Sequence, residues 1–210
     1  MNVLKNAKVK TKLFFMLTSF FIFLAIIGAT GYYYLQNSNA KINTIYKNKL
    51  LPVEYLGQAQ AQYNSSNTDL FELMITKDIN RNNELLKDRK TKKNALNTAI
   101  AEYGNTKLDS FEVDTLKQLT DNFATADSFI GNIESLTSAN KNEEAYTEYN
   151  NNLNTVNLKI EKNLTDLINY NIKTSLELNQ QNAADYNKAR LIIIVIILMA
   201  LIIETIISLE

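Results

Sequence analysis

An uncharged apolar stretch from Leu13 to Leu35 runs directly into a heptad pattern that ends at Lys77. About 20 consecutive apolar residues are enough for a helix to cross the hydrocarbon core of a bilayer. Beyond Leu35 the chain turns polar, but seam positions recur at alternating steps of three and four residues, the spacing of a helix packed along one face. These positions are Ile42, Ile45, Lys49, Pro52, Leu56, Ala59, Tyr63, Ser66, Leu70, Leu73 and Lys77. The sequence therefore predicts one long helix that leaves a membrane and continues into water for roughly 60 Å, at 1.5 Å per residue.

A second apolar stretch, Leu191 to about Leu209, closes the 210-residue chain. Four parts are predicted: a basic tail at 1–12, a transmembrane helix at 13–35, a domain at 36–189 and a second transmembrane helix at 190–210. The stretch between the spans is long enough for one domain. The whole chain contains one proline and five glycines, too few for a fold built from strands and tight turns, so we expect an all-α domain.

The composition excludes several kinds of function. The chain has no cysteine and no histidine, which rules out disulfides, thiolate catalysis and His-based triads or metal sites. Residues 36–189 contain 17 basic and 20 acidic residues, whereas a nucleic-acid-binding domain would need a basic excess. We therefore expect no enzyme activity, no cofactor, no metal and no nucleic-acid partner.

The tail before the first span contains four lysines and no acidic residue. By the positive-inside rule this tail stays in the cytoplasm, and a second span returns the C-terminus to the same side. The prediction is a multi-pass protein of the bacterial plasma membrane with both termini cytoplasmic. A signal peptide cleaved near Ala29–Gly31 is the alternative, but the apolar run is longer than the usual 7–15 residues.

Charges at the second span follow the rule less closely. Lys188 and Arg190 flank its outer side, and Glu204 falls inside the apolar run. A carboxylate within a span is functional by default. Because Glu204 is near the inner end, we expect it to reach the cytoplasmic interface instead.

The soluble segment divides into four predicted helices. The first continues to about Thr76–Asp78 with a kink at Pro52, because a proline inside a helix removes a hydrogen bond; a polar turn at 80–83 follows. The second covers about 83–103, the third begins at Asp109 or Ser110 and ends near 138–140, and the fourth runs from about Glu143 into the second span. Short connections force neighbouring helices to be antiparallel, so we predict an up-down-up-down four-helix bundle continuous with both spans.

This layout resembles the N-terminal part of bacterial methyl-accepting chemotaxis receptors whose sensing domain is a four-helix bundle between two spans. The resemblance rests on the basic tail, the span at 13–35, Leu51-Pro52, Asn64 and Asn67, the sequence at 70–76, the unequal helix lengths and the second span. It implies a homodimer through the first helices. It also implies sensing of a small ligand, or of a periplasmic or extracellular binding protein, and a signal carried by displacement of the fourth helix.

The chain departs from that family at Glu210, where such a receptor would enter its cytoplasmic signalling part. The expectation is a sensing region that lacks this part. Two alternatives stay open: a truncated or stand-alone scaffolding membrane protein, and the input domain of a sensor histidine kinase.

Two polar clusters are candidate sites. On the first helix, Gln62, Tyr63, Ser66 and Asn67 could hydrogen-bond a small polar ligand; the alternative is a polar solvated face with Tyr63 in the seam. On the second helix, a basic cluster could receive an anion or a partner protein, although a charged run is more often a solvated face. Its members are Arg89, Lys90, Lys92 and Lys93.

Overall fold

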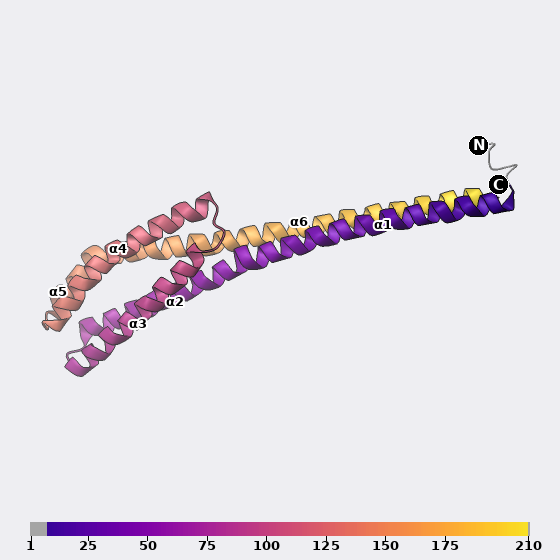
Figure 1. Cartoon of the computed structure of the whole chain (residues 1–210). Helices are drawn as coiled ribbons and strands as arrows, with labels where there is room; N and C mark the ends of the chain where they lie inside the picture. The colour runs from indigo at the N-terminus through magenta and orange to yellow at the C-terminus, as the bar shows by residue number, and fades with distance from the viewer. Residues whose placement is uncertain (1–7, 210) are drawn as a thin grey trace. The chain divides into compact units, whose positions relative to one another are not determined.

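The computed structural model describes residues 8–209, and this part of the chain consists of helices and short turns with no strand (Figure 1). The elements are α1 (Val9–Ile45), the π-helical turn η1 (Tyr46–Leu50), α2 (Leu51–Ile75), α3 (Ile79–Gly104), α4 (Ser110–Ser138), α5 (Asn142–Glu148), the π-helical turn η2 (Tyr149–Leu153) and α6 (Asn154–Leu209). The predicted all-α fold is confirmed. The basic tail that carries Lys5 lies largely outside the described residues.

The chain forms two compact units, residues 1–44 with 177–210, and residues 45–176. The first unit contains two helical stretches that are long and apolar enough to cross a membrane. Most of their large apolar side chains are exposed, for example Phe14 at 67% and Leu201 at 59%, as lipid-facing side chains would be. The Ser19 hydroxyl donates to the Glu204 carboxylate at 2.5 Å, so Glu204 bonds the neighbouring apolar helix instead of lacking a protein partner. The expected position of Glu204 at the cytoplasmic interface stays a prediction.

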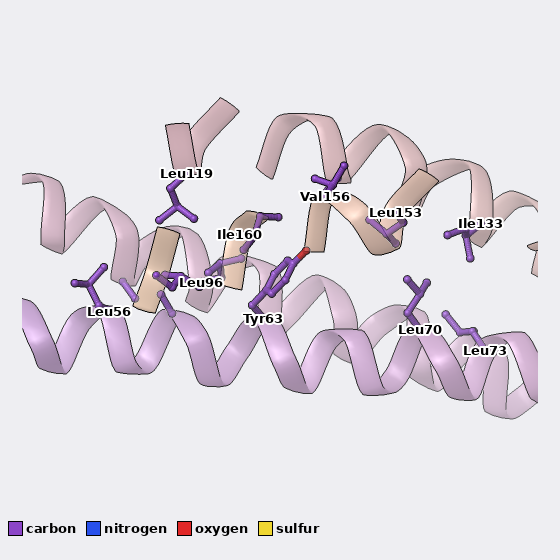
Figure 2. Packing of buried hydrophobic residues seen from close by; sticks show 14 of the residues in the cluster. Leu56, Tyr63, Leu70, Leu73, Leu96, Leu119, Ile133, Leu153, Val156 and Ile160 are labelled. Atoms are coloured by element: carbon purple, nitrogen blue, oxygen red, sulfur yellow. The ribbon is translucent and has the colours of Figure 1, made fainter. Parts of the chain in front are cut away.

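The second unit is the antiparallel four-helix bundle, built from α2, α3, α4 and the α5–η2–α6 segment as far as residue 176. Its core is a continuous apolar cluster with contributions from all four helices (Figure 2). The fully buried members include Leu56, Leu70, Leu85, Leu119, Ile133, Leu153, Ile160 and Leu167. Burying each such side chain contributes about 1.5–3 kcal/mol to stability, so this apolar core is the main stabilising feature of the bundle.

The α2–α3 turn lies earlier than predicted. Helix α3 begins at Ile79 because the Asp78 carboxylate accepts hydrogen bonds from the backbone N–H groups of Asn80 and Arg81. An N-cap of this kind satisfies donors that the first helical turn leaves free. The polar residues 80–83 are therefore the first turn of a helix, and the predicted turn at 80–83 was wrong.

The other two connections agree with the sequence. Asp109 caps α4 in a reciprocal capping box, in which Glu112 bonds back to the Asp109 backbone, an arrangement that satisfies two free donors at once. Helix α4 ends at Ser138, and Asn140 adopts a positive φ of 57°. Asparagine tolerates this left-handed conformation better than most residues, which allows the sharp reversal into α5.

Pro52 sits at the start of α2, directly after the π-helical turn η1. A proline has no backbone N–H and so cannot donate the hydrogen bond that an α-helix requires. The π-helical turn η1 lies just before Pro52, the residue that lacks this donor. The helix continues without a break across this point. The predicted seam also holds from Lys49 to Leu73, but Ile42 and Lys77 at its ends are exposed, and α2 ends before Lys77.

Candidate ligand-binding site

A pocket of about 410 Å³ opens on the side of the bundle between α2, α3 and α4. Three of the four predicted residues, Gln62, Tyr63 and Ser66, line it, together with the whole basic cluster of α3. The complete lining is Gln62, Tyr63, Ser66, Leu86, Arg89, Lys90, Lys92, Lys93, Leu96, Asn97, Phe123, Ala126, Asp127, Ile130, Gly131 and Glu134. The two clusters that the sequence suggested separately are thus parts of one pocket.

Arg89 is the central cation of this pocket. It is only 5% exposed, so the view of the basic cluster as a solvated face was wrong for this residue. Its Nε donates to the Glu134 carboxylate of α4 at 2.8 Å, and its Nη1 donates to the backbone carbonyl of Ser66 on α2. Arginine suits this position because its planar guanidinium offers several donors in a fixed geometry. One side chain therefore ties together the three helices that form the pocket.

The lysines give the pocket an excess of positive charge. Lys92 pairs with Asp69 at 2.5 Å and Lys93 with Asp127 at 2.8 Å. Lys90 makes no ion pair within residues 8–209. Four cationic and two anionic side chains line the pocket, and Asp69 outside the lining neutralises Lys92. One positive charge, that of Lys90, therefore remains unpaired and attracts anions.

Aromatic and aliphatic side chains complete the walls. The Tyr63 and Phe123 rings meet edge to face with their centroids 5.3 Å apart, a favoured geometry for aromatic pairs. Burial raises the pKa of Tyr63, and the Asn67 amide offsets only part of this rise, so the phenol stays protonated. Its hydroxyl donates to Asn157 of α6 at 2.5 Å. Tyr63 therefore connects the pocket wall to the fourth helix of the bundle.

The fourth predicted residue, Asn67, is outside the pocket lining. The contribution of α4 was not predicted, although a signal for it exists. Phe123, Asp127, Ile130 and Glu134 recur at steps of three and four residues, so they lie on one face of the helix. Groups of three or more acidic residues that could hold a metal are absent from the described residues.

A four-helix bundle with a charged lateral pocket, in one chain with two helices able to cross a membrane, has the architecture of a membrane-associated sensory domain. A family model described as a four-helix-bundle sensory module for signal transduction matches residues 6–186. The chain belongs to this family, the sensory modules of methyl-accepting chemotaxis receptors, which is a sensory and not a catalytic class. No curated protein gives a significant match to the chain.

Proposed function

We propose that residues 36–189 form the extracytoplasmic sensory domain of a chemoreceptor-type protein and that the α2–α3–α4 pocket binds a small organic anion. The buried Arg89 at the centre of a net-positive pocket supports this most directly. Lys90 supplies an unpaired cation, and the Tyr63–Phe123 pair supplies an apolar surface. A carboxylate with a small apolar or aromatic body matches these groups, because charged donors form the strongest hydrogen bonds to carboxylates.

Binding would act on α6 through Tyr63. A ligand carboxylate competes with Glu134 for Arg89, and a change in the pocket wall reaches Asn157 through the Tyr63 hydroxyl. Helix α6 continues from Asn157 toward the second apolar stretch. A small displacement of this helix, of the kind known for receptor switching, would carry the signal across the membrane.

The test is binding of succinate and benzoate to the full chain in phosphatidylcholine nanodiscs, measured by calorimetry. Lys90→Gln should weaken binding at least about tenfold, since a hydrogen bond to a charged group contributes about 1.5–3 kcal/mol. Lys87→Gln is the matched control, because Lys87 is exposed on the same helix and outside the pocket. Binding should also weaken with added salt.

Two results would contradict the proposal: no heat from either acid, or equal weakening by both lysine substitutions. Equal weakening would mean that the anion responds to general surface charge. A thermal melt of each variant checks that the bundle is intact, because a ligand that binds only the folded state raises the melting temperature.

We also propose that the two apolar helices span the plasma membrane, with both termini in the cytoplasm. The lysine-rich tail supports this orientation. The native chain has no cysteine, so single cysteines report topology cleanly. Asn83→Cys in the bundle should react with a membrane-impermeant maleimide in intact cells, whereas Asn6→Cys in the basic tail should react only after lysis. The opposite pattern would reverse the orientation.

The remaining part of the proposal is a homodimer through the first helix of the bundle. A second line of positions on η1 and α2 lies outside the buried core and recurs at helical spacing; it consists of Tyr46, Leu50, Val53, Gly57, Ala61 and Asn64. Ala61→Cys should cross-link two subunits in membranes under mild oxidation, and Asn83→Cys on α3 should not. Equal cross-linking at both positions would indicate random collision.

A further inference from the structure

A second groove lies between α4 and α6 and shares no residue with the anion pocket. Its volume is about 530 Å³. Five of its residues come from α4 and four from α6; they are Phe111, Thr115, Gln118, Asp121, Asn122, Lys159, Lys162, Asn163 and Asp166. This groove was not predicted from the sequence, because its polar residues belong to helices far apart in the chain.

The floor of the groove is polar and almost fully buried. Thr115 is 6% exposed and Asn163 is 8% exposed. The Asn122 Nδ2 donates to Asn163 Oδ1 at 2.9 Å, so the Asn163 NH2 group and the Asn122 carbonyl oxygen are not used by this bond. The Thr115 hydroxyl likewise has no hydrogen-bond partner within residues 8–209.

These free groups are not sealed inside the protein. The unpaired side-chain atoms that are closed to solvent within the described residues are Asn82 Oδ1 and Asn171 Oδ1. Thr115 and Asn163 instead reach solvent through the groove that they line. Buried polar groups are normally hydrogen-bonded, so a floor with open donors and acceptors is suited to a partner that supplies both.

The wall and rim show which kind of partner fits. The Phe111 ring is 42% exposed and rests on the Tyr170 ring, with centroids 4.5 Å apart, so it offers a fixed apolar surface. The rim has two lysines and two aspartates, and Lys162 pairs with Asp166 at 2.5 Å. The groove therefore has no net charge, unlike the pocket between α2, α3 and α4.

We propose that this groove binds a small neutral polyhydroxy molecule, a monosaccharide. Each sugar hydroxyl both donates and accepts a hydrogen bond, which matches the amide pair and the Thr115 hydroxyl. The C–H face of a sugar ring matches the Phe111 surface. A ligand in this groove contacts α6 directly. The bundle would then have a binding site for a neutral ligand in addition to the anion-binding pocket of the proposed function.

The experiment is saturation-transfer NMR on the full chain in phosphatidylcholine nanodiscs, with glucose, galactose, mannose and ribose as probes. At least one sugar should receive saturation from the protein. Thr115→Val keeps the shape of the side chain but removes its hydroxyl, and should weaken binding about fivefold or more. Thr120→Val is the matched control, because Thr120 is exposed on α4 and bonds the Lys117 carbonyl.

Absence of transfer to all four sugars would overturn the proposal, as would unchanged binding in Thr115→Val. Displacement of the sugar by succinate together with weakening in Lys90→Gln would also overturn it, because both place the sugar in the anion pocket. Phe111→Leu provides an independent check if Thr115→Val fails to fold. Loss of succinate binding with intact sugar binding would refute only the anion proposal, so the two can fail separately.

Discussion

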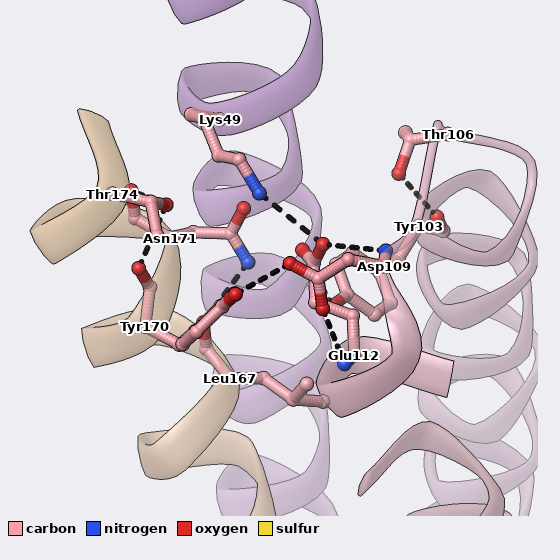
Figure 3. Close-up of polar contacts among 9 residues, drawn as sticks. All are labelled: Lys49, Tyr103, Thr106, Asp109, Glu112, Leu167, Tyr170, Asn171 and Thr174. Carbon is pink, nitrogen blue, oxygen red and sulfur yellow. Dashed lines mark hydrogen bonds and ion pairs between the residues drawn. The ribbon is translucent and has the colours of Figure 1, made fainter. Parts of the chain in front are cut away.

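Glu112 has no exposed surface, yet it is a carboxylate with three hydrogen-bond donors around it (Figure 3). Lys49 of η1 and the Tyr103 hydroxyl of α3 each approach it at 3.2 Å, and the Asp109 backbone N–H at 3.1 Å. Desolvating a charged pair is costly unless such bonds compensate for the lost water. This residue therefore joins the first helix, the end of α3 and the start of α4.

Removing one charge of this pair should destabilise the bundle more than removing both. Lys49→Met leaves Glu112 charged and buried without its cation, and we expect a loss of about 3–5 kcal/mol in unfolding free energy. Lys49→Met combined with Glu112→Gln should recover much of that loss. Denaturant titrations of the two single variants and the double variant form a cycle that measures the coupling. Additive losses would show that the pair does not interact energetically.

Asp109 makes the stability of the bundle depend on pH. Burial alone would raise the pKa of Asp109, but hydrogen bonds from the Tyr170 hydroxyl and from backbone N–H groups outweigh it and lower the pKa. A carboxyl group whose pKa is lowered by folding stabilises the fold above its unfolded pKa of about 3.9. This contribution is lost as the pH falls through the folded-state pKa.

Asp109→Asn should therefore lower the melting temperature at pH 7, and the difference from the wild type should shrink below about pH 4. Thermal melts of the full chain across this range provide the measurement. Asp114→Asn is the matched control, because Asp114 is exposed on α4 little more than one turn after Asp109. A difference that persists unchanged at low pH would show that the Asp109 charge is not responsible.

At the scale of the helices, the cap of α3 accounts for the early start of that helix. Asp78→Ala should cost about 1 kcal/mol of stability, the usual effect of removing an aspartate N-cap. Asp88→Ala, an exposed position within the same helix, should change stability by less than about 0.5 kcal/mol. Circular dichroism melts compare the two variants. Equal melting temperatures for the two variants would show that the Asp78 hydrogen bonds do not stabilise the fold.

The sequence predicted these helices well because their apolar spacing extends over many turns. The prediction failed at residues 80–83, whose polar composition is typical of a loop. The N-cap Asp78 instead makes these residues the first turn of a helix. The π turns gave no signal, because their composition does not differ from the neighbouring helix. Lys49 was placed in the seam, but its buried partner lies 63 residues away in the chain.

The candidate site was also predicted only as far as its signals are local in the sequence. Residues on α2 and α3 were found because each cluster is local in sequence. The pocket that combines them with α4 depends on tertiary packing, which the spacing of one helix does not reveal. Arg89 illustrates this: a cation in a basic run is usually solvated, but here α2 and α4 cover it.

At the scale of the whole molecule, the Ser19–Glu204 hydrogen bond defines the register between the two apolar helices. Cysteines at 19 and 204 should be joined by a short bifunctional thiol reagent within one chain in nanodiscs. Cysteines at 19 and 205 should react much less, since one residue turns a helix by about 100°. Mass spectrometry identifies the product. Equal yields from both pairs would mean that this register is not fixed.

The two π turns have a consequence for insertions and deletions. A π turn accommodates one residue more than the α-helical turn it replaces, so the seams on either side keep their phase. Deleting Asn48 or Asn151, which lie inside η1 and η2, would leave each long helix a regular α-helix with its buried stripe aligned. The same deletion at Ala59 would rotate everything beyond it by about 100°. Each of the two long helices can therefore lose one residue at its π turn, η1 or η2, without repacking of the bundle core.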